Sequence, residues 1–179
     1  MEAVLSIFMD GKGQWFNNPV NLNDIIISFF CITLVCLAII DIKTYQLPDI
    51  FTQPLLWFGL VFNSGDNLIP IKSAIYGAIS GYLFLWVLYW LCRCVFKKEG
   101  VGYGDLKLAA AIGAWIGMEM IPVLMLLSSI SGLLGFAIIW LKRKNYPEFI
   151  AFGPYLCFSA ILLMFFYLSG INIIELAQV

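Results

Sequence analysis

The chain consists largely of long apolar runs separated by short polar connections, and this pattern constrains the fold more than any other feature. A membrane span needs about 20 mostly apolar residues. A soluble domain carries about 25% charged residues, whereas this chain has 12% charged and 62% hydrophobic residues. A soluble chain of 179 residues would have to bury nearly every helix, which a domain of this size cannot do. The sequence therefore predicts an integral membrane protein.

Six apolar runs predict an all-α, polytopic membrane helix bundle with about six transmembrane helices. They cover residues 25–41, 50–62, 69–92, 105–118, 120–140 and 150–170. The second run contains Pro54, and the second and fourth are short for a span. Gly77 and Gly81 lie one helical turn apart in the third run, which favours close packing against another helix. We expect an extracytoplasmic segment over residues 1–24 and one membrane-embedded domain over residues 25–177.

The basic residues predict the orientation of this bundle. Eight of the ten lie in or beside the connections that follow the first, third and fifth runs: Lys43, Arg93, Lys97, Lys98, Lys107, Lys142, Arg143 and Lys144. The other side holds only Lys12 and Lys72. Because basic connections stay in the cytoplasm, both termini are expected outside the cytoplasm. Asp41, Asp49 and Asp105 are then expected at the cytoplasmic face of the membrane.

The residue types that are missing exclude several kinds of chemistry. There is no histidine, which excludes Ser-His-Asp catalysis and histidine-ligated zinc. The five cysteines form no Cys-x-x-Cys pair. We expect no metal and no cofactor. Nucleic acid is not an expected partner, because the longest basic tract has only three residues. The six tryptophans are expected mostly near span ends or on lipid-facing surfaces.

Asp41 is the carboxylate that local helix chemistry does not explain. It follows a long apolar run, at the expected C-terminal end of its helix, where the helix dipole disfavours an anion. No N-cap role is available there. A carboxylate in such a place requires a function or a buried partner.

Asp49 and Asp105 have a simpler structural alternative, because aspartate caps helix N-termini well. For Asp49, which follows Pro48, the N-cap role is the favoured interpretation. Asp105 also follows Gly102 and Gly104, which a helix cap does not need. Glycines permit unusual torsions and close approach of another chain, and a loop that binds an extended peptide requires these properties. The alternative is a simple membrane turn.

Together, Asp41 and Asp105 suggest acid–base hydrolysis. Two aspartates that share one proton can activate water with one carboxylate and protonate a carbonyl oxygen with the other. The alternative is a non-enzymatic membrane transporter or assembly scaffold whose carboxylates carry protons or pair with partner helices.

At these residues the chain resembles the type IV prepilin leader peptidases, the bacterial members of the GxGD aspartic proteases. The resemblance rests on DIKTYQLPDIFTQPLLWFGLVFN from Asp41, on GVGYGDLKLAAAIGAWIG and the following IPVLMLLSSISGLLG, and on FGPYL from Phe152. It implies an inner-membrane aspartic endopeptidase, with its site facing the cytoplasm, that cleaves type IV prepilins or type II secretion pseudopilins. It implies that Asp41 and Asp105 are catalytic. The resemblance also points to residues that bind substrate or shape the loops: Pro48, Asp49, Gly102, Tyr103, Gly104, Gly153 and Pro154.

The chain departs from the family pattern in three respects. Ala151 stands where the family usually has proline, and Val101 where methionine is common. The third departure is the absence of the cytoplasmic domain with two Cys-x-x-Cys pairs, which the family associates with methylation of the new N-terminus. We therefore expect peptidase activity without methyltransferase activity.

Overall fold

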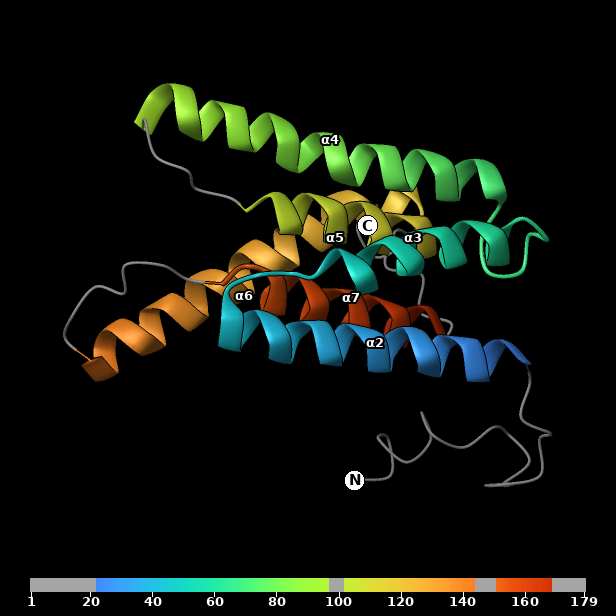
Figure 1. Cartoon of the computed structure of the whole chain (residues 1–179), viewed down its shortest axis with the longest axis horizontal. Helices are drawn as coiled ribbons and strands as arrows, with labels where there is room; N and C mark the ends of the chain where they lie inside the picture. Colours follow the sequence, from blue (N-terminus) through green and yellow to red (C-terminus); the bar gives the residue numbers. More distant parts are fainter. Residues whose placement is uncertain (1–21, 97–101, 144–150, 169–179) are drawn as a thin grey trace, which may run out of the picture.

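The chain folds into a helical bundle in which each predicted apolar run forms one helix (Figure 1). The computed structural model describes residues 22–96, 102–143 and 151–168, and these ranges contain no strand. The elements are α2 (Leu22–Thr44), α3 (Asp49–Asn63), α4 (Ile71–Phe96), α5 (Tyr103–Ile116), the 3-10 helix η1 (Met118–Met120), α6 (Ile121–Arg143) and α7 (Gly153–Leu168). The predicted all-α class is therefore confirmed. Most of the predicted N-terminal segment, residues 1–21, and the end of the predicted domain lie outside the described residues.

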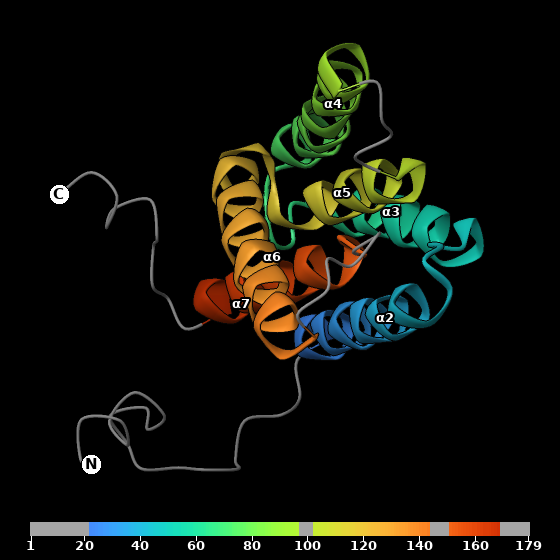
Figure 2. The same ribbon diagram turned by 90° about the vertical axis from the view of Figure 1, so that its left-hand side faces the viewer.

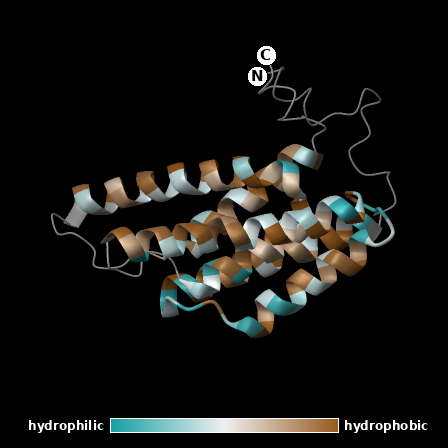
Figure 3. Cartoon of the chain, turned by 90° about the horizontal axis from the view of Figure 1, so that it is seen from above, coloured by the Kyte–Doolittle hydropathy of each residue, from teal (hydrophilic) through white to brown (hydrophobic). Residues whose placement is uncertain are grey.

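Consecutive α-helices run in opposite directions, so the ends of α2, α4 and α6 gather with the beginnings of α3, α5 and α7 (Figure 1). Apolar residues run along the helices, and hydrophilic residues gather at their ends and in the connections (Figure 3). Lys43 and Arg93, near the ends of α2 and α4, therefore belong to the same end of the bundle as Lys107 near the beginning of α5. This shared end was predicted from the basic residues, whereas the side of the membrane that it faces stays a prediction.

Three helices are long and apolar enough to cross a membrane. These spans are Ile25–Thr44, Ile71–Val95 and Met118–Ile138. The helices α3, α5 and α7 have 15, 14 and 16 described residues. At about 1.5 Å per residue they fall short of a hydrocarbon layer of about 30 Å. Within the described residues, three of the six predicted transmembrane helices are thus long enough to span a membrane, and the spanning of α3, α5 and α7 stays a prediction.

Glycines bring α4 and α5 into direct backbone contact, as the spacing of Gly77 and Gly81 predicted. A Cβ atom on Gly77 would collide with the carbonyl oxygen of Gly113, and one on Gly81 would lie 2.6 Å from the carbonyl oxygen of Ala109. These contacts fix the antiparallel register of the two helices. They also place α4 directly against α5 on one flank of the bundle (Figure 2).

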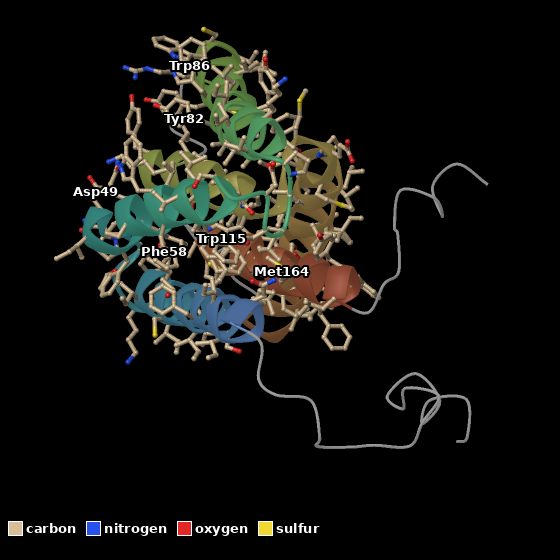
Figure 4. The ribbon with its side chains drawn as sticks, turned by 90° about the vertical axis from the view of Figure 1, so that its right-hand side faces the viewer. Asp49, Phe58, Tyr82, Trp86, Trp115 and Met164 are labelled. Atoms are coloured by element: carbon tan, nitrogen blue, oxygen red, sulfur yellow. The ribbon has the colours of Figure 1, made fainter. Side chains whose placement is uncertain are left out.

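Trp115 of α5 lies at the centre of the core, and its side chain is only 1% exposed (Figure 4). Its ring stacks on Phe30 of α2 at 4.6 Å between centroids and also on Phe58 and Phe62 of α3. The indole N–H donates a hydrogen bond to the carbonyl oxygen of Leu55 at 3.0 Å. Trp115 thus lies near a helix end, as predicted for most of the tryptophans, but in the core and not on a lipid-facing surface. Its burial is possible because a carbonyl group satisfies the indole N–H.

Candidate active site

Asp41 lies in the last turn of α2, and only 4% of its surface is exposed. The helix ends three residues later, where Tyr45 takes a left-handed conformation with φ of 52°. The N–H of Tyr45 donates to the carbonyl oxygen of Asp41 at 2.8 Å, a bond typical of a helix C-terminus. The predicted position at a helix C-terminus is therefore confirmed.

Asp105 is the third residue of α5 and is 8% exposed. Its carboxylate oxygen Oδ2 accepts the N–H of Gly102 at 3.3 Å, while its own N–H donates to the carbonyl oxygen of Gly102 at 3.1 Å. This reciprocal pair resembles a capping box. The capping role proposed for Asp105 is thus present, and it holds the carboxylate against the Gly102–Gly104 segment.

The two aspartates meet in one pocket at the shared end of the bundle. The pocket has a volume of about 310 Å³. Its lining residues are Asp41, Tyr45, Gln46, Leu47, Gly102, Tyr103, Gly104 and Asp105. Asp41 and Asp105 interact electrostatically across it. Because two neighbouring carboxylates resist double ionisation, such a pair readily holds one shared proton.

The Asp41 carboxylate lies against the beginning of α7 and keeps one oxygen without a hydrogen-bond partner. The backbone amide of Gly153 interacts with this carboxylate. The oxygen Oδ2 is buried and accepts no hydrogen bond within the described part of the chain. A proton or a bound water on Oδ2 would satisfy this oxygen.

Glycines around the pocket are needed for close approach. A Cβ atom on Gly104 would lie 2.9 Å from the Cβ of Leu47, and one on Gly153 would lie 2.5 Å from Oδ2 of Asp41. Among the described glycines only Gly117 has a positive φ. Gly104 is therefore needed for close packing within the chain, whereas close approach of a bound peptide at the Gly-x-Gly segment stays a prediction. Gly102 and Gly104 do not have the unusual torsions that glycine permits.

Asp49 forms an ion pair rather than the predicted N-cap. It is the first residue of α3, and the N-cap position belongs to Pro48, which makes no side-chain capping bond. Both oxygens of Asp49 accept the ammonium group of Lys107 at 2.7 Å. This pair joins the beginning of α3 to α5, two residues beyond Asp105. Pro48, Asp49 and Pro154 do not line the pocket, whereas Gly153 contacts it through Asp41.

Sequence reasoning missed the pocket residues that follow Asp41. Tyr45, Gln46 and Leu47 form the connection between α2 and α3, and the side chain of Leu47 packs against both Gly104 and Gly153. The sequence signal that could have identified Leu47 as a packing residue is its position as a single leucine in a short polar connection.

Comparison with known proteins assigns most of the chain to one family. Residues 28–138 match the model of the type IV leader peptidase family. The chain belongs to this family. No solved structure matches it. Within the described residues, no three His, Cys, Asp or Glu side chains gather as a metal site requires.

Named relatives of the leader peptidase family support the assignment. The chain is 46% identical over 136 residues to the prepilin leader peptidase/N-methyltransferase of Escherichia coli K12, covering 75% of this chain and 59% of that protein. It is 45% identical over 127 residues to the protein of the same name from Dickeya chrysanthemi, covering 70% and 44%. The corresponding protein of Burkholderia pseudomallei is 42% identical over 137 residues, covering 76% and 44%. The chain spans about half the length of these relatives.

Proposed function

We propose that this chain is a membrane aspartic endopeptidase that removes the leader from type IV prepilins or type II secretion pseudopilins. The reaction takes place at the cytoplasmic face of the bacterial inner membrane and uses no metal or cofactor. The observation that carries the proposal is the meeting of Asp41 and Asp105, more than sixty residues apart, in one pocket of a leader peptidase family member.

The two aspartates supply the acid and the base for peptide hydrolysis. One carboxylate takes a proton from a water molecule as its oxygen attacks the scissile carbonyl carbon, and the other carboxyl group protonates the carbonyl oxygen. The resulting gem-diol collapses, the carbon–nitrogen bond breaks, and the leaving nitrogen receives a proton from the pair. The shared proton returns to its starting state, so no covalent intermediate and no metal are required.

The shape of the pocket suits an extended peptide. Its volume of about 310 Å³ accommodates a few peptide residues, and Gly102, next to Asp105, adds no side chain to its lining. A substrate backbone can therefore approach Asp105 closely at this residue. Tyr45 and Tyr103 add aromatic side chains to the lining.

We further propose that the residues present in this chain cleave without methylating. Methyl transfer requires a bound donor held in line with the new amino group. The family resemblance associates that step with paired Cys-x-x-Cys motifs, and the five cysteines here form none.

Substitution of the two aspartates tests the peptidase. Asp41→Ala and Asp105→Ala should each lower the rate of leader removal by about 10²–10⁴-fold, because removing a positioned acid or base costs that much. Glu119→Ala is the matched control, since Glu119 is an exposed carboxylate at the opposite end of α5. Product N-termini are read by mass spectrometry after co-expression with a prepilin.

Two outcomes of this experiment favour a different function. Near-normal cleavage by membranes containing Asp105→Ala would contradict the two-aspartate mechanism. A transporter or scaffold would tolerate Asp→Glu at one site and would process no precursor even in the wild type.

A further inference from the structure

An apolar groove is lined by residues of α3, α4 and α5, where α3 and α4 both pack on α5. Figure 2 shows the arrangement of these three helices, and Figure 4 labels Tyr82 on α4. It has a volume of about 340 Å³. The lining residues are Leu56, Ala78, Ile79, Tyr82, Leu83 and Ala110. Apart from the hydroxyl group of Tyr82, these side chains carry no polar atom. Its lining residues lie in the middle part of α3, α4 and α5, away from the polar ends of the bundle.

The groove has a narrow floor and projecting walls. Ala110 of α5 and Ala78 of α4 form the floor, and small residues of this kind allow another helix backbone to approach closely. Ile79 and Leu83, one helical turn apart on α4, are 50% and 48% exposed and form one wall. A groove with small and large lining residues of this kind can bind another helix.

The groove and the pocket of the two aspartates each have lining residues on one face of α5. Tyr103, Lys107 and Ala110 follow one another at helical spacing on that face. Tyr103 lines the pocket and Ala110 lines the groove. Along the helix axis, Ala110 is displaced from Asp105 by only about 7.5 Å.

We propose that this groove binds the hydrophobic helix of the substrate, which enters the groove sideways from the bilayer. The inference rests on the proposed peptidase function and on a further implication of the family resemblance, that the cleaved bond directly precedes an apolar helix of the substrate. A helix seated on Ala110 would have its first residues level with the pocket. The chain just before it would then cross the first turn of α5, beside Tyr103, to reach Asp105.

The contacts between α4 and α5 predict the register of the bound helix. Gly77 lies opposite Gly113 and Gly81 opposite Ala109, so Leu83 is level with Lys107 and Ile79 with Ala111. Leu83 is therefore about 6 Å nearer to the catalytic end than Ile79. Contacts from Leu83 should fall about one turn nearer the cleavage site of the substrate than contacts from Ile79.

Photo-crosslinking tests this arrangement. A benzophenone amino acid is placed at Ile79, at Leu83 or, as a control, at Ile32. Ile32 is an exposed residue of α2, a helix that lies across the bundle from α4 (Figure 1). Each enzyme is reconstituted with a purified type IV prepilin that carries its complete hydrophobic segment. We expect crosslinks from Ile79 and Leu83 to the first two turns of that segment, in the stated order, and none from Ile32. Equal crosslinking from Ile32, a reversed order, or crosslinks only to lipid or to a second copy of the enzyme would overturn the proposal.

Filling the groove separates docking from chemistry. Ala78→Leu should raise KM for the full prepilin at least tenfold. It should leave unchanged the cleavage of a short peptide that spans the cleavage site but lacks the helix. Equal effects on both substrates, or on neither, would contradict the groove. A wild-type enzyme that cleaves neither substrate would instead contradict the peptidase function, and the crosslinking pattern would still report on docking.

Discussion

The contact between Gly153 and Asp41 predicts that one methyl group disables the enzyme without unfolding it. In Gly153→Ala the new Cβ would lie 2.5 Å from Oδ2 of Asp41, whereas ordinary contacts begin near 3.4 Å. The carboxylate must therefore move by about 0.9 Å, the difference between these two distances. A misplacement of about 1 Å at a catalytic group costs about 10²-fold in rate, or about 2.7 kcal/mol of transition-state stabilisation.

The assay for Gly153→Ala compares kcat, KM and thermal stability with those of a matched variant. Gly132→Ala is suitable, because a Cβ there would meet only the Tyr155 ring at 3.7 Å, an ordinary contact. We expect kcat of Gly153→Ala to fall about 10²-fold with Tm close to that of the wild type, and Gly132→Ala to retain kcat. Wild-type kcat in a folded Gly153→Ala enzyme would refute the placement of the Asp41 carboxylate against α7.

Three further predictions concern the ion pair, the topology and the product. Asp49→Asn and Lys107→Gln should each destabilise the protein by no more than about 1 kcal/mol, since the Lys107 and Asp49 side chains are 37% and 59% exposed. The double variant should be no worse than either single one, and additive losses in a thermal denaturation series would contradict a direct pair. A cysteine introduced near Asn18 should react with an impermeant reagent in cells with an intact inner membrane, whereas one near Lys144 should not; the reverse pattern would place the pocket on the wrong face. A prepilin processed by this chain alone, in a host without other prepilin methyltransferases, should lack a methyl group on its new N-terminus, because methyl transfer needs its own donor site. An added mass of about 14 Da on the product, the mass of one methyl group in place of a hydrogen, would disprove this.

The sequence could predict that Asp41 and Asp105 lie at the same end of the bundle, because this depends only on the number of helices between them. Each apolar run reverses the chain, and the charges of the connections identify which ends belong together, so two distant carboxylates are assigned to one end without any knowledge of packing. Helix termini were predictable for the same reason, from apolar runs and turn residues.

The contacts that shape the site depend on three-dimensional packing and were not predictable in this way. Nothing local in the sequence pairs Lys107 with Asp49, which are 58 positions apart. The need for glycine at residue 104 depends on where Leu47 packs. The buried position of Trp115 depends on a carbonyl group from α3 that accepts its N–H. In each case the deciding partner comes from a different helix.

The short length of α3 has a consequence for the membrane itself. This helix exposes Ile50, Trp57 and Val61 to lipid, yet its 15 residues extend only about 22 Å. The Asp49–Lys107 pair marks the polar limit at one end, and the exposed residues Ser64 and Asp66 mark it at the other. Beside a helix this short we expect a bilayer with a hydrocarbon core of about 30 Å to thin locally, with headgroups and water drawn inward. We therefore expect the rate of hydrolysis to depend on the acyl-chain length of the surrounding lipid.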